Sequence, residues 1–228
     1  MYLVTYTSYL LFFSVITWYG LWVMHRSEHR KNLVQIDDPI YHIVPLCDTS
    51  IPVFSLLWTG SLVFFYYYDQ WDWMQASWSF MLLMISRSIV LYLHPFKGHE
   101  TMIPLVDPIT EFFVQSKSPF RNDLSFSGHV STLVLFGLLM PRIYKIYYWW
   151  GAFITGWLLV LSRVHYTADV FIAPMFSYFC YHLALTLYPL WYIYGNIPTA
   201  LAISSILLSL TVIDLKERVL TRGMSDSH

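Results

Sequence analysis

The sequence predicts an all-α fold, a transmembrane helical bundle of six or seven spans that forms a single domain over residues 1–228. Hydrophobic residues make up 57% of the chain and charged residues only 12%, and the mean hydropathy is +0.50, well above that of water-soluble domains. Aromatic side chains gather at the ends of long apolar runs, as in "FFYYYDQWDW" and "YYWW", which is typical of membrane interfaces. We therefore expect a multi-pass integral membrane protein.

The first expected span is residues 2–24, which contain no charged side chain and exceed the roughly 20 residues that cross a bilayer. This run lacks the basic start and cleavage site of a signal peptide, so we interpret it as a retained span. Further apolar runs cover residues 51–68, 73–93, 124–140, 146–162, 170–194 and 197–213. We expect a core of about residues 38–187 and a C-terminal extension, residues 188–228, with a candidate extra span.

Two polar segments are longer than simple connections. Residues 25–52 include Pro39, Pro45 and Pro52, which favours an irregular surface segment. Residues 94–123 lead directly into "SFSGHV". Because long loops in compact proteins tend to carry function, this second segment is the expected cover of an active site.

Charge and cysteine content exclude some functions. The formal net charge of −1 gives no basic field for a nucleic-acid partner. The two cysteines, Cys47 and Cys180, have neither the spacing of a metal site nor the density of a disulfide scaffold.

The basic residues predict how the chain is oriented in the membrane. With seven spans, two basic residues, Arg142 and Lys145, fall on one side, and nine fall on the other: Arg26, Arg30, Lys31, Lys97, Lys117, Arg121, Lys216, Arg218 and Arg222. The more basic side, which also carries both histidine motifs, is then expected to be cytoplasmic.

Two histidine motifs carry the expected chemistry. In "HYTADV", His165 and Asp169 are four residues apart, so on a helix they share one face and the carboxylate can hold one ring nitrogen of the imidazole. In "SFSGHV", Ser127 is a good N-cap, Gly128 lets a ligand approach the backbone, and His129 lies in a first turn whose free amides attract anions. These groups suit phosphoryl transfer through a phosphohistidine, without a metal or another cofactor.

Several cations are expected to bind the phosphate. Arg163 precedes His165 by two residues, and Arg121 and Lys117 precede the Ser127 cap. Arg87 lies inside an apolar run, where it either reaches an interface or faces the bundle and binds phosphate. A zinc or iron site formed by the two histidines and Asp169 is disfavoured by these positive charges. A structural alternative is that the histidines only make hydrogen bonds between helices.

The two motifs together resemble the type-2 phosphatidic acid phosphatase superfamily, and specifically its sphingomyelin synthase-like branch. Asp123, Ser127, Gly128 and His129 match the first motif of that branch, and residues 165–169 match its H-Y-T/S-x-D motif. By this match Asp123 is also expected to help bind the substrate. The stretches "DPIYHIVPLCDTSIP" and "RSIVLYLHPFKGHETMIPLVDPITE" also resemble bacterial members. Asn122, Val130 and Arg121 depart from the branch pattern, so its ceramide specificity does not carry over.

The resemblance implies a six-helix, metal-independent membrane enzyme that acts on a phospholipid, with a lipid alcohol or water as acceptor. His165 would be the nucleophile, Asp169 its orienting acid and His129 the general acid and base. The resemblance also implies an exoplasmic or lumenal site, in contrast to the basic residues. Two alternatives remain: a phosphatase acting on phosphatidic acid or a polyprenyl pyrophosphate, and a non-catalytic binder or transporter of lipid head groups.

Overall fold

The computed structural model describes residues 2–30, 33–68, 73–107, 121, 122, 124 and 126–194, together with Ser204, Leu208, Leu210 and Thr211. Within these residues the chain forms α-helices, a 3-10 turn and loops, with no β-strand, so the all-α prediction is confirmed. Contacts divide the chain into two compact units, Gly20–Thr186 and Met1–Tyr19 with Leu187–His228. All site residues discussed below belong to the first unit.

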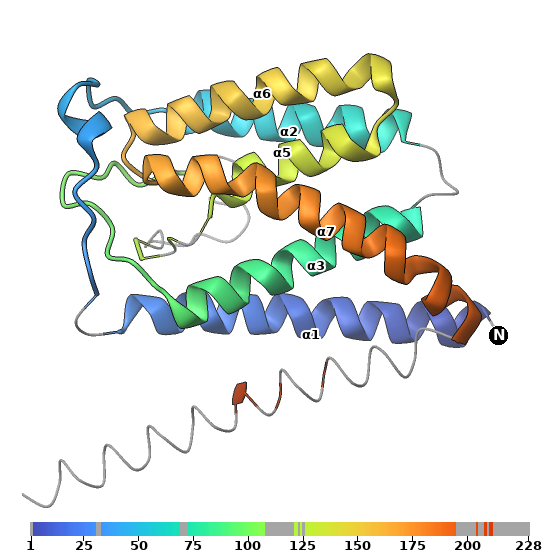
Figure 1. The fold of residues 1–228 in the computed structure, drawn as a ribbon. Coiled ribbons are helices and arrows are strands. Elements are labelled where there is room, and N and C mark those ends of the chain that lie inside the picture. The colour runs from blue at the N-terminus through green and yellow to red at the C-terminus, as the bar shows by residue number, and fades with distance from the viewer. Residues whose placement is uncertain are drawn as a thin grey trace, which may run out of the picture. The chain divides into compact units, whose positions relative to one another are not determined.

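The helices follow the predicted apolar runs (Figure 1). In chain order the elements are α1 (Tyr2–Glu28), η1 (Pro39–His42), α2 (Ser50–Tyr67), α3 (Trp73–Leu93), α5 (Gly128–Leu139), α6 (Arg142–Leu161) and α7 (Thr167–Tyr194). The described residues between α1 and α2 are irregular apart from η1, but the two ends of the predicted irregular segment, residues 25–28 and residues 50–52 with Pro52, belong to α1 and α2. The bounds of α3 agree with the prediction. The run at 197–213 lies largely outside the described residues.

The starts of α5 and α6 differ most from the predicted bounds, and both differences have local reasons. α5 begins at Gly128 instead of residue 124, because the Ser127 side chain caps it by accepting a hydrogen bond from the Val130 N–H at 3.3 Å. α6 begins at Arg142, directly after Pro141, instead of at residue 146. A search for apolar runs misses this first turn, because it contains Arg142, whose side chain is exposed and needs no apolar partner.

α5 forms the centre of the core. It packs against α6, α2 and α3, and α2 also packs against α6. Its buried residues lie all around the helix, as expected for a helix that is hydrophobic on every side. They are Val130, Ser131, Leu133, Val134, Leu135, Phe136 and Gly137.

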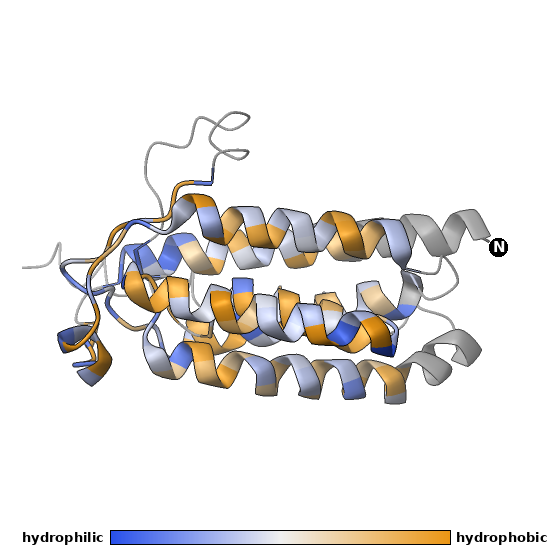
Figure 2. Ribbon diagram, turned by 90° about the horizontal axis from the view of Figure 1, so that it is seen from above, coloured by the Kyte–Doolittle hydropathy of each residue, from blue (hydrophilic) through white to orange (hydrophobic). Residues whose placement is uncertain are grey.

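Large apolar side chains also cover the outer surface, among them Phe65 on α2, Phe153 on α6 and Phe171 on α7. Hydrophobic residues recur along every coloured helix (Figure 2). Three helical stretches are long and apolar enough to cross a bilayer: Ser50–Tyr67, Gln75–Leu93 and Thr167–Leu187. These features support a membrane protein, and the count of six or seven spans stays a prediction.

A glycine allows α6 and α7 to approach closely beside the second motif. A Cβ at Gly156 would lie 2.5 Å from Val170 Cγ1, a distance that forces the helices apart. We expect Gly156→Ala to destabilise the fold by about 1–3 kcal/mol, since overpacking strains a filled core. Gly151, on the same helix, has open space at its Cβ position.

Gly151→Ala is therefore the control, and its alanine should be neutral or stabilising through helix propensity. Thermal unfolding of both variants in detergent measures the difference. Equal melting temperatures for the two variants would contradict close packing at Gly156.

Candidate active site

The two histidine motifs meet where α5 and α7 begin. The Ser127 N–H donates to the Asp169 carbonyl oxygen at 3.2 Å, so the cap of α5 is bonded to the first turn of α7. The Ser127 hydroxyl caps α5 itself. A direct backbone hydrogen bond thus joins the first motif to the second.

His165 and Asp169 form a buried pair. His165 Nδ1 lies 3.5 Å from Asp169 Oδ2, and each residue is only 3% exposed. The same Oδ2 accepts the Tyr166 N–H at 3.2 Å. The predicted pair is therefore present, but not through a shared helix face: His165 lies in the loop before α7, which begins at Thr167.

His129 lies in the first turn of α5 and is partly buried. Its ring meets Phe54 of α2 edge-on, with the centroids 5.6 Å apart. His165, Arg87 and Asp107 lie close enough to act on it electrostatically. His129 Nδ1 is buried and has no hydrogen-bond partner within the described part of the chain.

Arg87 crosses from α3 to the first motif. Its Nε donates to the Phe126 carbonyl at 3.4 Å, and a Cβ at Gly128 would lie only 3.2 Å from that nitrogen. The absence of a side chain at Gly128 thus lets the guanidinium lie against the start of α5. The prediction that Arg87 faces the bundle agrees with this position, which adds positive charge beside the helix N-terminus.

The Arg163 guanidinium binds protein groups. Its Nη1 donates to Thr101 Oγ1, its Nη2 donates to the Tyr41 carbonyl at 2.9 Å, and its Cζ lies 5.5 Å from the Tyr41 ring centroid. Arg163 also contributes, after burial, to holding the pKa of His99 below its usual value. In this structure Arg163 therefore ties its loop to two neighbouring segments.

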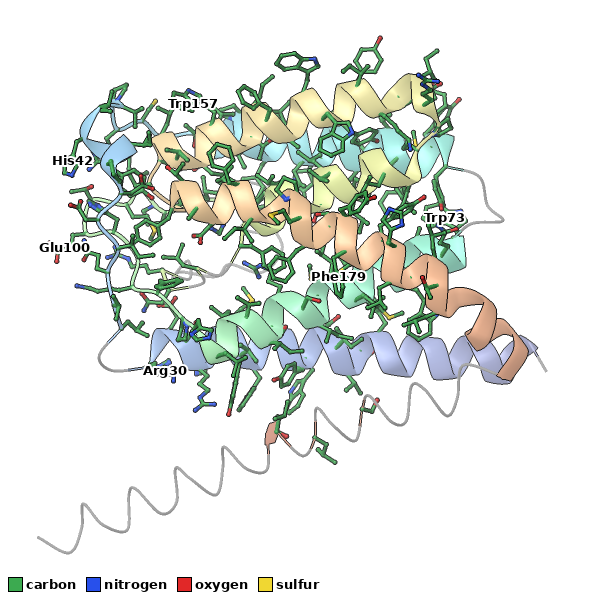
Figure 3. The ribbon with its side chains drawn as sticks, in the orientation of Figure 1. Arg30, His42, Trp73, Glu100, Trp157 and Phe179 are labelled. Atoms are coloured by element: carbon green, nitrogen blue, oxygen red, sulfur yellow. The ribbon has the colours of Figure 1, made fainter. Side chains whose placement is uncertain are left out.

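Arg121 lines a surface pocket of about 590 Å³. The other lining residues are Glu28, Arg30, Leu33, Lys97, Gly98, His99, Glu100 and Asn122. Arg30 and Glu100 lie at the same end of the helices as His42 (Figure 3). Neither His129 nor His165 lines this pocket, so the structure does not bring Arg121 together with the two histidines. Lys117 and Asp123, also predicted to bind substrate, lie outside the described residues.

Two residues that contact the second motif were not predicted. Asp38 accepts a hydrogen bond from the Thr167 N–H, and Tyr41 donates one to the His165 carbonyl. The sequence feature that could have pointed to them is the "DPIY" stretch, in which an N-cap residue precedes a proline. That signal predicts a turn, but it does not indicate which distant segment the turn contacts.

No group of three or more His, Cys, Asp or Glu side chains that could hold a metal ion occurs among the described residues. Independence from metals stays a prediction.

Comparison with known proteins gives one match. No curated protein and no solved structure matches the chain significantly. Residues 122–187 match the family model for the PAP2 superfamily C-terminal region. This range contains His129, His165 and Asp169, and runs from the cap of α5 into α7. The match covers less than half of the chain, and over this range the chain is similar to the PAP2 superfamily.

Proposed function

We propose that this protein moves a phosphate-linked group from a phospholipid to a lipid alcohol or to water through a phosphohistidine at His165. The observation that carries the proposal is the buried His165–Asp169 pair bonded through Ser127 to the start of the helix that bears His129. A nucleophile, its orienting acid and a second imidazole thereby share one site, the arrangement that covalent catalysis needs.

In the first half-reaction, His165 Nε2 attacks phosphorus and the bond from phosphorus to the leaving oxygen breaks. Asp169, on the Nδ1 side, stabilises the positive charge that develops on the ring. His129 gives its proton to the leaving oxygen. In the second half-reaction, His129 takes a proton from the acceptor hydroxyl or water, whose oxygen attacks phosphorus and releases Nε2.

The phosphate oxygens would be bound by N–H groups in the first turn of α5, helped by the helix dipole, and by Arg87. Arg163 would hold the loop of His165 and add positive charge. Lys117 and Asp123 would bind the head group, whereas Arg121 lines a pocket that neither histidine lines. The roles of Arg87 and Arg163 are supported by their contacts with the loops that carry the two motifs.

Head-group transfer of the sphingomyelin synthase type is the specific reaction that we propose. It needs an acceptor that competes with water, so we expect product only when a lipid alcohol is supplied. The purified protein in mixed micelles would receive phosphatidic acid, phosphatidylcholine or phosphatidylethanolamine, with and without ceramide or diacylglycerol. The expected result is a new phospholipid that appears only with the acceptor.

Two other outcomes would change the assignment. If free phosphate were released from phosphatidic acid at the same rate with and without the acceptor, the protein would be a phosphatase instead of a transferase. Lipid binding without any product from these donors or from a polyprenyl pyrophosphate would overturn the enzyme and leave a non-catalytic head-group binder.

A further inference from the structure

We propose that residues 38–41, the "DPIY" turn, form a clasp that positions His165 for attack, a role that rests on the proposed function of His165. Asp38 and Tyr41 act through the loop and touch no reacting atom, so both are positioning residues. The turn comes from a part of the chain more than 120 residues before the motif.

The clasp contacts Arg163, His165 and Thr167, which lie in the loop before α7 and at its first residue. The Tyr41 carbonyl accepts from Arg163 Nη2 at 2.9 Å, and the Tyr41 hydroxyl donates to the His165 carbonyl at 2.9 Å. Asp38 Oδ2 accepts the Thr167 N–H at 2.6 Å. One short turn therefore fixes the backbone at the His165 carbonyl and at Thr167, and it holds the loop before His165 through the Arg163 side chain.

The clasp is itself held rigidly. Asp38 Oδ1 accepts the Ile40 N–H at 3.0 Å, and the Asp38 carbonyl accepts the Tyr41 N–H at 3.0 Å. Pro39 fixes its own backbone angle at the first position of the turn. Asp38 is 6% exposed and Tyr41 4%. One carboxylate thus serves two helix starts, that of η1 and that of α7, and its charge complements the α7 dipole.

The loop needs such support because it is not regular. Arg163 has a φ of 57°, a left-handed conformation that costs a non-glycine residue free energy and persists only when its surroundings hold it. His165 lies outside α7, and the contact of its ring with Asp169, at 3.5 Å, is longer than a normal hydrogen bond. The direction of the ring therefore depends on the His165 backbone, which the Tyr41 hydroxyl fixes, as well as on Asp169.

The Tyr41 hydroxyl stays a donor under assay conditions. Burial, and then the Asp38 carboxylate, raises the pKa of Tyr41 well above its usual range. The phenol therefore remains protonated across the pH range of an enzyme assay, and the hydrogen bond to His165 does not titrate. We expect the pH profile of activity to show no ionisation from this residue.

Tyr41→Phe tests the clasp because it keeps the ring over Arg163 and removes only the hydroxyl. Tyr148→Phe is the matched control, since the Tyr148 hydroxyl donates to a backbone carbonyl, that of Gly60, at 2.7 Å away from the motifs. We expect Tyr41→Phe to lower kcat by about 10- to 100-fold with KM within about threefold, because misplaced reacting groups slow chemistry more than binding. Tyr148→Phe should keep kcat within about twofold.

A kcat for Tyr41→Phe within about twofold of the wild-type value, or an equal loss in Tyr148→Phe, would refute the clasp. Asp38→Asn is the second variant, for use also if Tyr41→Phe does not fold. The asparagine keeps one oxygen acceptor but cannot serve the Ile40 and Thr167 N–H groups together. It should likewise lower kcat more than it raises KM.

An activity-independent readout separates the clasp from the proposed function. In protein labelled with ¹⁵N-histidine, the His165 ring signals are assigned by their loss in His165→Gln. Tyr41→Phe should shift these signals and Tyr148→Phe should not. Unchanged signals in Tyr41→Phe would refute the clasp, whatever the activity. A shift in a protein whose wild type has no activity would refute the proposed function and leave the clasp standing.

Discussion

Replacing His165 by glutamine should lower kcat by at least about 10⁴-fold, because no other group can form the covalent intermediate. His165 is buried beside Asp169, and the amide of glutamine is not a nucleophile. Initial rates of product formation in lipid micelles measure the loss. A donor labelled in its phosphate should also leave label on the wild-type protein and none on the variant.

His182→Gln is the control for this variant, because His182 lies on α7, the helix that follows His165, and its ring packs against Tyr178, with centroids 4.2 Å apart, away from the motifs. Its turnover should stay near that of the wild type. If His165→Gln retained near-normal turnover, or if His182→Gln lost as much, the nucleophile would have to be reassigned.

Asp169→Asn should lower kcat by about 10²- to 10⁴-fold, since the amide cannot stabilise a positively charged imidazole. The asparagine can still accept the Tyr166 N–H, so we expect the loop to keep its fold. The measurement is kcat under saturating substrate, together with the rate at which label appears on the protein in a single turnover. Formation of the labelled intermediate should slow as much as kcat.

Two comparisons sharpen this prediction. Asp48→Asn removes a carboxylate whose Oδ1 accepts the Ser50 N–H at 2.9 Å at the start of α2, and it should leave kcat within about twofold. Combining Asp169→Asn with His165→Gln should give little further loss, because residues that act as a unit are not additive. If the kcat of the double variant fell by the product of the two single losses, Asp169 would act independently of His165.

Local features of the site were predictable from sequence because near neighbours produce them. Ser127 caps α5 as its position before an apolar run predicts, and the apolar runs became helices because each can bury or present to lipid a continuous hydrophobic surface. The spacing of His165 and Asp169 also predicted their contact, although the loop before α7, and not a helix face, brings them together.

The sequence by itself thus determined the helical membrane class, the two motifs and the cap that begins α5. Only the tertiary structure decided that Arg87 lies against Gly128, that Arg163 binds Tyr41 and Thr101, and that Arg121 lines a separate pocket. It also brought Asp38 and Tyr41 to the loop of His165. Hydrogen bonds within a turn depend on residues a few positions apart, whereas these contacts join segments far apart in the chain and exist only once the helices have packed.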